Sequence, residues 1–156
     1  MNRWIAALIA VPFILDAAAA SAGQLTLGRA HARAGSEVAV PLQYRQQHGA
    51  AVVALMTDVD VDPTVVTNAR CRSGTAATAA GKTVACSLKG RRLRVLVFGL
   101  NTNVIPDGEV ASVTFDVSPH ARARLYILRQ RSTGADATGR EFRLAHGNGA
   151  VRVGRR

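Results

Sequence analysis

Apolar and polar residues alternate at every second position in several short segments of this 156-residue chain, and no other feature of the sequence constrains the fold as strongly. Successive side chains of a β-strand point to opposite faces, so a period of two predicts strands with one buried face. The pattern is clearest in residues 37–44, 51–62, 93–98 and 109–117, with shorter candidates at 125–128 and 150–153.

Clusters of Gly, Pro, Asp and Asn separate these segments and are typical of turns. They are residues 34–36, 62–64, 89–91, 105–108 and 147–149. No segment carries the apolar stripe of an amphipathic helix, and we expect a surface loop or a single turn in the Ala-rich stretch 76–80. Short strands at near-regular spacing with such turns predict an all-β sandwich or barrel.

The first 22 residues have the organisation of a secretory signal peptide. Arg3 supplies a positive n-region, residues 4–15 form an apolar run, and a small-x-small cleavage pattern ends at Ala22. The run is too short to cross a bilayer, which requires about 20 apolar residues. We therefore expect cleavage between Ala22 and Gly23 and a secreted or periplasmic protein that does not span a membrane after cleavage.

The remaining residues, 23–156, suffice for one hydrophobic core and are too few for two ordinary domains, so we expect a single domain. The chain carries 20 Lys and Arg against 10 Asp and Glu, a formal net charge of +10. A positive field of this size favours anionic partners such as acidic glycans or anionic lipid. Export argues against nucleic acid as a partner, and a base-composition bias toward Ala and Arg would produce the same charge without any ligand.

Two cysteines, Cys71 and Cys86, remain after the signal segment is removed. An even number in an oxidising compartment indicates a disulfide, which would close a loop of about 15 residues and stabilise the fold by about 3 kcal/mol. The alternative, a metal site with two thiolates, would need histidines nearby. The histidines are scattered singly, at His31, His48, His120 and His146. The pattern therefore favours the disulfide and predicts no metal site.

Several short motifs, in their order and spacing, resemble the cohesin domain, the module that grips dockerin domains in cellulosome scaffolds. The most specific is Ile105-Pro106-Asp107-Gly108-Glu109-Val110-Ala111-x-Val113-x-Phe115-x-Val117. The others are Gly35-x-x-Val38-x-Val40-Pro41, Asp62-Pro63-x-x-Val66, Asp136-x-x-Gly139-x-Glu141 and Asn148-Gly149-x-Val151-x-Val153. The resemblance covers residues 25–153. It implies a nine-stranded jelly-roll β-sandwich and a non-catalytic adaptor linked to polysaccharide binding or degradation.

In cohesins one flat sheet face binds the dockerin, and the strand before the Asp-Pro turn contributes an Asn and an Asp to that face. Here the resemblance places these two positions at Ala54 and Met56, so the polar pair is absent. Alternation adds Asp58 and Asp60 to the same strand face. The implied partner-binding face is Ala54, Met56, Asp58 and Asp60, for a dockerin-like or other envelope protein. The alternative is an ordinary outward strand face with solvated carboxylates.

Two other functions remain open. The first is a carbohydrate-binding module for acidic glycans, because closely spaced arginines can present paired guanidinium groups. These arginines are Arg91, Arg92, Arg94, Arg122, Arg124, Arg129 and Arg131. The few aromatic residues after position 22 argue against binding of crystalline polysaccharide. The second alternative is a structural envelope protein that associates with itself.

No arrangement typical of an active site occurs in the sequence. The histidines lie in expected turns or at strand ends, and there is no nucleophile-elbow motif. Asp58, Asp60 and Asp62 lie on one strand rather than across a cleft, which argues against paired catalytic carboxylates. An EF-hand loop beginning at Asp58 would need Gly and Glu where Pro63 and Ala69 stand. We therefore expect no catalysis, no cofactor and no EF-hand calcium site.

Overall fold

The computed structural model describes residues 23–47, 49 and 51–154, and most of them lie in strands. The strands are β1 (Gly23–Leu27), β2 (Arg29–Arg33), β3 (Glu37–Gln46), β4 (Ala54–Asp60), β5 (Val66–Ser73), β6 (Thr83–Lys89), β7 (Arg92–Phe98), β8 (Gly108–Val117), β9 (Leu125–Ala135), β10 (Glu141–Arg143), β11 (Ala145–Gly147) and β12 (Gly149–Gly154). The one helix among the described residues is α1 (Thr75–Ala79).

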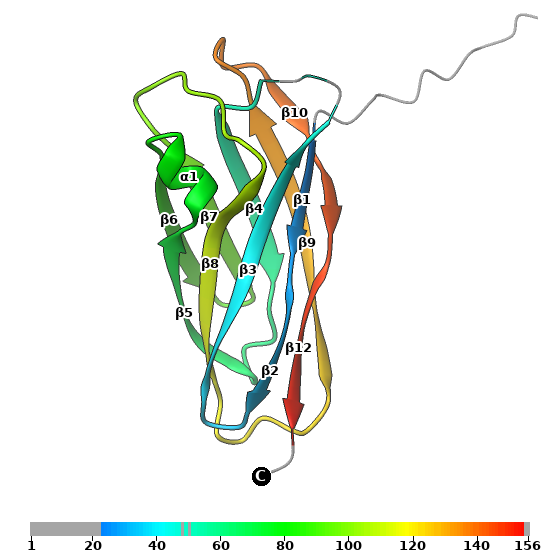
Figure 1. The fold of residues 1–156 in the computed structure, drawn as a ribbon. Helices are drawn as coiled ribbons and strands as arrows, with labels where there is room; N and C mark the ends of the chain where they lie inside the picture. The colour runs from blue at the N-terminus through cyan, green and yellow to red at the C-terminus, as the bar shows by residue number, and fades with distance from the viewer. Residues whose placement is uncertain (1–22, 48, 50, 155–156) are drawn as a thin grey trace, which may run out of the picture.

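The expected all-β sandwich is confirmed, with two sheets packed face to face (Figure 1). The five-stranded sheet has the order β11-β1-β3-β8-β5, and the seven-stranded sheet has the order β2-β12-β9-β4-β7-β6, with β10 paired to β9. The described residues form 12 strands rather than the nine expected. The difference arises because the outer segments of the chain switch sheets and are interrupted at Gly28, Leu144 and Asn148.

The switch from β1 to β2 depends on close contact between Gly28 and Pro41 of β3. The Gly28 amide donates a hydrogen bond of 2.8 Å to the Pro41 carbonyl, and a Cβ at position 28 would lie 2.8 Å from the Pro41 ring. Glycine is therefore required here, because any side chain would separate the two backbones. Pro41 itself cannot donate to the sheet, and the pairing of β3 with β8 shifts register just after it, between Leu42 and Gln43.

The core lies between the two sheets and is built from the inward residues of the alternating strands. Val38, Val40 and Leu42 of β3 and Val113 and Phe115 of β8 are each at most 7% exposed. Truncating a fully buried aromatic residue such as Phe115 to alanine typically costs about 3–5 kcal/mol. The alternation in the sequence thus determines which side of β3 and β8 meets the core.

One open side of the sandwich is closed by a covalent bond between two edge strands. β5 ends the five-stranded sheet and β6 ends the seven-stranded sheet, and a disulfide joins Cys71 of β5 to Cys86 of β6. The predicted disulfide is confirmed. The sequence did not indicate β5 or β6 as strands, because inward residues such as Ala69 and Val84 are only half-buried and the apolar alternation is weak.

The Ala-rich stretch between β5 and β6 forms α1, a helix of little more than one turn, and packs on the sandwich instead of lying on the surface. Ala76 and Ala77 are buried, as is Ala80 just after the helix. Gly74, which precedes the helix, lies so close to the Glu109 carbonyl of β8 that a Cβ would overlap it. The short helix agrees with the single turn that was one of the two expectations, whereas the expected surface position was wrong, because small side chains let this segment approach the sheet closely.

β9 is the longest strand, with 11 residues, although only its beginning was expected from the sequence. Its later inward positions are Gln130 and Ser132, so the apolar alternation stops while the strand continues. These two side chains and Thr57 of β4 form a buried polar cluster. Thr57 Oγ1 lies 2.8 Å from Ser132 Oγ and 3.3 Å from Gln130 Oε1. Hydrogen bonding thus replaces apolar contact at the centre of β9.

Gln130 also connects the two sheets. Its Nε2 donates hydrogen bonds to the backbone carbonyls of Leu25 in β1 (2.6 Å) and Gly147 in β11 (2.7 Å). Both acceptors belong to the five-stranded sheet, whereas Gln130 belongs to the seven-stranded sheet. The side chain therefore holds the region where the chain after β10 leaves β9 and pairs with β1.

The expected signal segment, residues 1–22, lies outside the described residues, as does the expected cleavage position at Ala22; Gly23 is the first residue of β1. Cleavage and export therefore stay predictions. No helix within the described ranges is long and apolar enough to cross a membrane.

Candidate functional site

The four predicted site residues lie on one side of β4, near the middle of the seven-stranded sheet. Ala54, Met56 and Asp58 are half-buried, Asp60 is exposed, and the residues between them are buried in the core. β9 flanks β4 on one side, and β7 followed by β6 flanks it on the other. We call the outward side of β9, β4, β7 and β6 the β4 face.

The β4 face is apolar toward the end of the sandwich where α1 lies (Figure 1). Met56 stands opposite Leu96 of β7 in the strand register. Leu55 pairs with Val97, so the next outward residues, Ala54 and Phe98, are also neighbours. Phe98 is 47% exposed. We call Ala54, Met56, Leu96 and Phe98 the apolar half of the face.

Leu96 and Phe98 were not among the predicted site residues, although the sequence contains a signal for them. Alternation in residues 93–98 assigns Leu93, Val95 and Val97 to the core, and the structure buries all three. Leu96 and Phe98 then fall on the solvent side, where a soluble strand normally carries polar residues. Apolar residues at expected outward positions are therefore the feature that would have extended the predicted site from β4 to β7.

The loop after β7 carries Leu100, which is fully exposed, and a buried lysine holds this loop in place. Lys82 Nζ donates to the backbone carbonyl of Asn101 at 2.8 Å and to its Oδ1 at 2.6 Å. Asn101 Nδ2 donates in turn to the Gly81 carbonyl at 3.0 Å. Burial lowers the pKa of Lys82. These bonds fix the chain just beyond the apolar half.

Toward the other end of β4 the face is basic. We call the following residues the basic half: Asp58 and Asp60 on β4, Arg92 and Arg94 on β7, Arg129 and Arg131 on β9, and Lys89 on β6. The sequence alone does not place the arginine pairs relative to one another. The strand order brings the β7 pair and the β9 pair to opposite sides of β4. Arg122 and Arg124 do not join them: Arg122 lies outside the strands of this face, and Arg124 forms an ion pair with Asp62 at 3.6 Å.

One carboxylate of the basic half is fully engaged. Arg94 donates from Nε to Asp58 Oδ1 at 2.7 Å and from Nη2 to Oδ2 at 2.8 Å. The hydrogen bond from Arg94 is the largest cause of a lowered pKa at Asp58, and the charges of Arg94 and Arg92 add to it. Within the part of the chain that the structure describes, Arg92, Arg129 and Arg131 form no ion pair. The basic half thus keeps unneutralised positive charge.

Two open hollows lie beside β4. The first, of about 810 Å³, is lined by Asp60, Ser87, Lys89, Arg91, Arg92 and Arg94. The second, of about 870 Å³, lies on the β9 side, and its lining includes Arg129, Arg131, Arg143 and His146 together with Met56 and Ile127. The second hollow exists because the chain beyond β10 turns away from β9 to pair with β1. Each hollow has a basic rim and reaches the carboxylate of Asp60.

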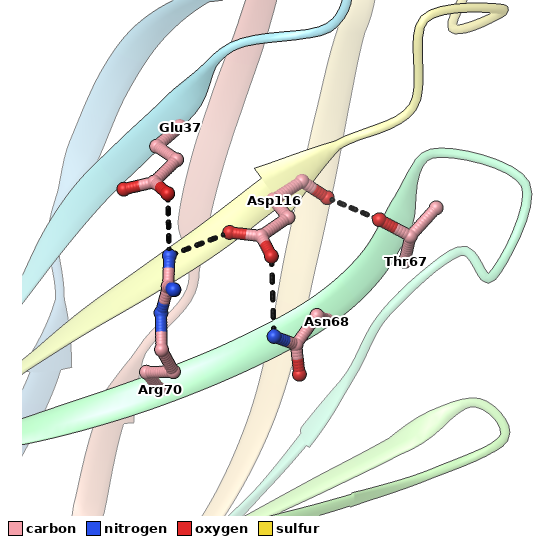
Figure 2. Close-up of polar contacts among 5 residues, drawn as sticks. All are labelled: Glu37, Thr67, Asn68, Arg70 and Asp116. Carbon is pink, nitrogen blue, oxygen red and sulfur yellow. Dashed lines mark hydrogen bonds and ion pairs between the residues drawn. The ribbon is translucent and has the colours of Figure 1, made fainter.

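The outward side of the opposite sheet has a different charge arrangement (Figure 2). Arg70 Nη2 lies 2.7 Å from Glu37 Oε1 and 2.8 Å from Asp116 Oδ1. Asn68 Nδ2 donates to the other oxygen of Asp116 at 3.1 Å, and the Thr67 hydroxyl donates to the Asp116 carbonyl at 3.2 Å. Hydrogen bonding to Glu37 is the main cause of a raised pKa at Arg70. An arginine on this side is therefore neutralised by two carboxylates.

The described residues contain no group of three or more His, Cys, Asp and Glu side chains arranged to hold a metal ion. Asp62 accepts hydrogen bonds from the amide (2.9 Å) and hydroxyl (2.6 Å) of Thr64, which lower its pKa and stabilise the turn after β4. Asp58 is bound to Arg94, so these two carboxylates face different partners. His48 lies outside the described residues.

The sequence matches no family model and no curated protein. Solved structures, however, match over most of the chain. The third cohesin of ScaC from Acetivibrio cellulolyticus, in complex with the ScaB dockerin, has a TM-score of 0.73 at 22% identity, covering 85% of this chain and 99% of its own. The OlpA cohesin from Clostridium thermocellum, also in complex with a dockerin, has a TM-score of 0.72 at 16% identity, covering 85% and 99%.

This chain has the cohesin fold. A non-cellulosomal cohesin from the archaeon Archaeoglobus fulgidus also matches, with a TM-score of 0.67 at 18% identity over 85% of this chain and 91% of its own. The resemblance found in the sequence is thus confirmed at the level of the fold. In this cohesin fold, β4 is the strand that precedes the Asp62-Pro63 turn, and its outward residues include Ala54 and Met56, the two positions given by the resemblance.

Proposed function

We propose that this chain is an exported, non-catalytic module that binds a partner protein through the β4 face. The observation that carries the proposal is the apolar half of that face. Met56, Leu96 and Phe98 present apolar side chains on the solvent side of a sheet whose other side already forms the core. Contiguous apolar surface bordered by charged residues is typical of protein interaction sites.

The geometry of a sheet makes this surface suitable for a flat contact. Directly opposed side chains on neighbouring strands are about 5 Å apart, so Ala54, Met56, Leu96 and Phe98 form one continuous patch. Methionine is flexible and polarizable and adapts to the shape of a partner. Backbone pairing on both sides keeps β4 and β7 in place, so little order would be lost on binding.

The related structures indicate the kind of partner. Two of the cohesins similar in fold were solved in complex with dockerin domains, which supports a protein rather than a small molecule. Ala54 and Met56 replace the polar pair expected of cohesins, so the partner would present apolar side chains at the centre of the contact. We propose a dockerin-like or other envelope protein; the link to polysaccharide degradation rests on the resemblance alone. The disulfide supports an oxidising compartment.

In the test, the exported chain is immobilised and incubated with the envelope and secreted fractions of the source cell, at a salt concentration that screens the net charge. The measurement is which proteins the chain retains. The informative variant is Met56→Asp, which places a carboxylate in the apolar half. The matched control is Ala39→Asp, which adds the same carboxylate to the outward side of β3 in the other sheet. Loss of a central contact typically costs 2 kcal/mol or more, so we expect affinity to fall by about 30-fold or more.

We expect one protein that is retained by the unmodified chain and by Ala39→Asp and is lost by Met56→Asp. Equal retention by all three forms, or no retained protein, would refute the proposal. Sedimentation of the purified chain provides a second criterion. If concentration-dependent oligomers form and Met56→Asp dissociates them, the face serves self-association instead.

A further inference from the structure

The basic half of the β4 face is not balanced by its own carboxylates. Five basic side chains surround Asp58 and Asp60, and Asp58 is already bonded to Arg94. On the opposite sheet, Arg70 is paired with both Glu37 and Asp116 (Figure 2). The outward side of that sheet also carries Arg45 and Arg72, but Glu37, Glu109 and Asp116 equal its three arginines in number. The excess of basic over acidic side chains is therefore larger on the β4 face.

The excess charge is placed on both sides of β4. Lys89, Arg91 and Arg92 line the first hollow, and Arg129, Arg131 and Arg143 line the second. β7 and β9 are separated by β4, so the backbones of these two strands are about 10 Å apart across the sheet. Arginine side chains bind carboxylates through two parallel hydrogen bonds. The face can thus receive anionic groups on either side of β4 at the same time.

The apolar half decides between two classes of anionic ligand. Met56 belongs to the apolar half and also lines the second hollow, so apolar and basic surfaces are continuous. An acidic glycan would use the cations and leave Met56, Leu96 and Phe98 uncovered. Neither hollow is lined by a Phe, Tyr or Trp side chain on which a sugar could stack. A protein surface that carries apolar residues next to carboxylates matches both halves.

We propose that the partner of the β4 face is an acidic protein surface, whose apolar side chains cover Met56, Leu96 and Phe98 and whose carboxylates enter the hollows on both sides of β4. This inference rests on the proposed function and specifies the partner of the same face. The apolar half contributes most of the affinity. The basic half accelerates association and fixes the orientation of the partner, because attraction between opposite charges acts before contact is made.

The test uses defined probes, so it does not depend on capture of the natural partner. Binding of a fluorescent ten-residue glutamate peptide, its glutamine counterpart and heparin to the exported chain is measured by anisotropy at low and at moderate salt. The face variant is Arg92→Gln with Arg129→Gln. The control is Arg45→Gln with Arg72→Gln, which removes the same charge from exposed positions on β3 and β5 of the other sheet.

We expect the glutamate peptide to bind more tightly than the glutamine peptide and to lose affinity as salt rises. Two exposed charge contacts together account for about a tenfold change in affinity. The face variant should therefore bind the glutamate peptide about tenfold more weakly, whereas the affinity of the control should stay within about twofold of that of the unmodified chain. Equal losses in the two variants would overturn the inference, because binding would then reflect net charge alone.

Binding of heparin that depends on the face, without binding of the glutamate peptide, would also overturn the inference and indicate a glycan site. The Met56→Asp capture experiment reports separately on the proposed function. If a partner protein no longer binds the Met56→Asp variant but binds the variant with Arg92 and Arg129 replaced as well as it binds the unmodified chain, the proposed function is supported. The inference that the partner surface is acidic is then overturned.

Discussion

Gln130→Met should destabilise the fold strongly. The sequence alone does not suggest this, because a polar residue in a strand usually faces solvent. Methionine has a similar length and volume, so the core stays filled and the change removes mainly hydrogen bonds. Gln130 is 2% exposed, and its Nε2 donates to the carbonyls of Leu25 at 2.6 Å and Gly147 at 2.7 Å. After the substitution both carbonyls lose this donor.

The magnitude follows from the cost of a buried polar group without a partner, about 1–3 kcal/mol each. Gly147 is only half-buried and can regain water, so we expect a loss of about 3 kcal/mol in the free energy of unfolding. For a domain of about 130 residues the entropy of unfolding is about 0.28 kcal/mol/K, so the melting temperature should fall by about 10 °C.

Urea unfolding followed by circular dichroism measures this loss. The control is Gln43→Met, the same substitution at an exposed position of β3, where we expect a change within about 0.5 kcal/mol. If Gln130→Met costs less than about 1 kcal/mol, or no more than Gln43→Met, then Gln130 does not hold the two sheets together and the reasoning is wrong.

Three further predictions concern single features. Replacing Cys71 and Cys86 by serine should cost about 3 kcal/mol in urea unfolding, because the loop of 15 residues becomes free in the unfolded chain, and a thiol assay on the oxidised parent should find no reactive thiol. The buried Tyr44 hydroxyl has no hydrogen-bond partner among the described residues, and burial, assisted by the charge of Asp107, raises its pKa to about 12. Because the unfolded pKa is about 10, stability should be full below pH 10 and fall by about 2–3 kcal/mol as the pH rises through about 12; Tyr44→Phe should abolish this fall, and an unchanged alkaline profile would contradict it. Arg94→Met should raise the pKa of Asp58 toward its ordinary value, as measured by NMR titration, whereas no change would exclude Arg94 as the cause.

Part of the candidate face could be predicted because it depends on local chain geometry. Alternation assigns Leu55 and Val59 to the core and Met56 and Asp58 to the solvent side, and the structure agrees. The same alternation stops at Gln130, because that inward position is satisfied by hydrogen bonds to carbonyls far away in the sequence. No local pattern could therefore indicate that β9 continues beyond its first residues.

The sequence by itself determined the all-β class, the two sides of β3, β4, β7 and β8, and the disulfide partners. These follow from a period of two along the backbone and from the presence of a single cysteine pair. Only the tertiary structure decided that Leu96 and Phe98 extend the patch around Met56 and that the arginines of β7 and β9 lie on either side of β4. Strand order is set by pairing between residues up to 121 positions apart in the chain, as for Gln24 with Ala145 and Arg29 with Ala150. That pairing depends on how whole sheets bury their apolar sides against each other, which no single segment of the sequence encodes.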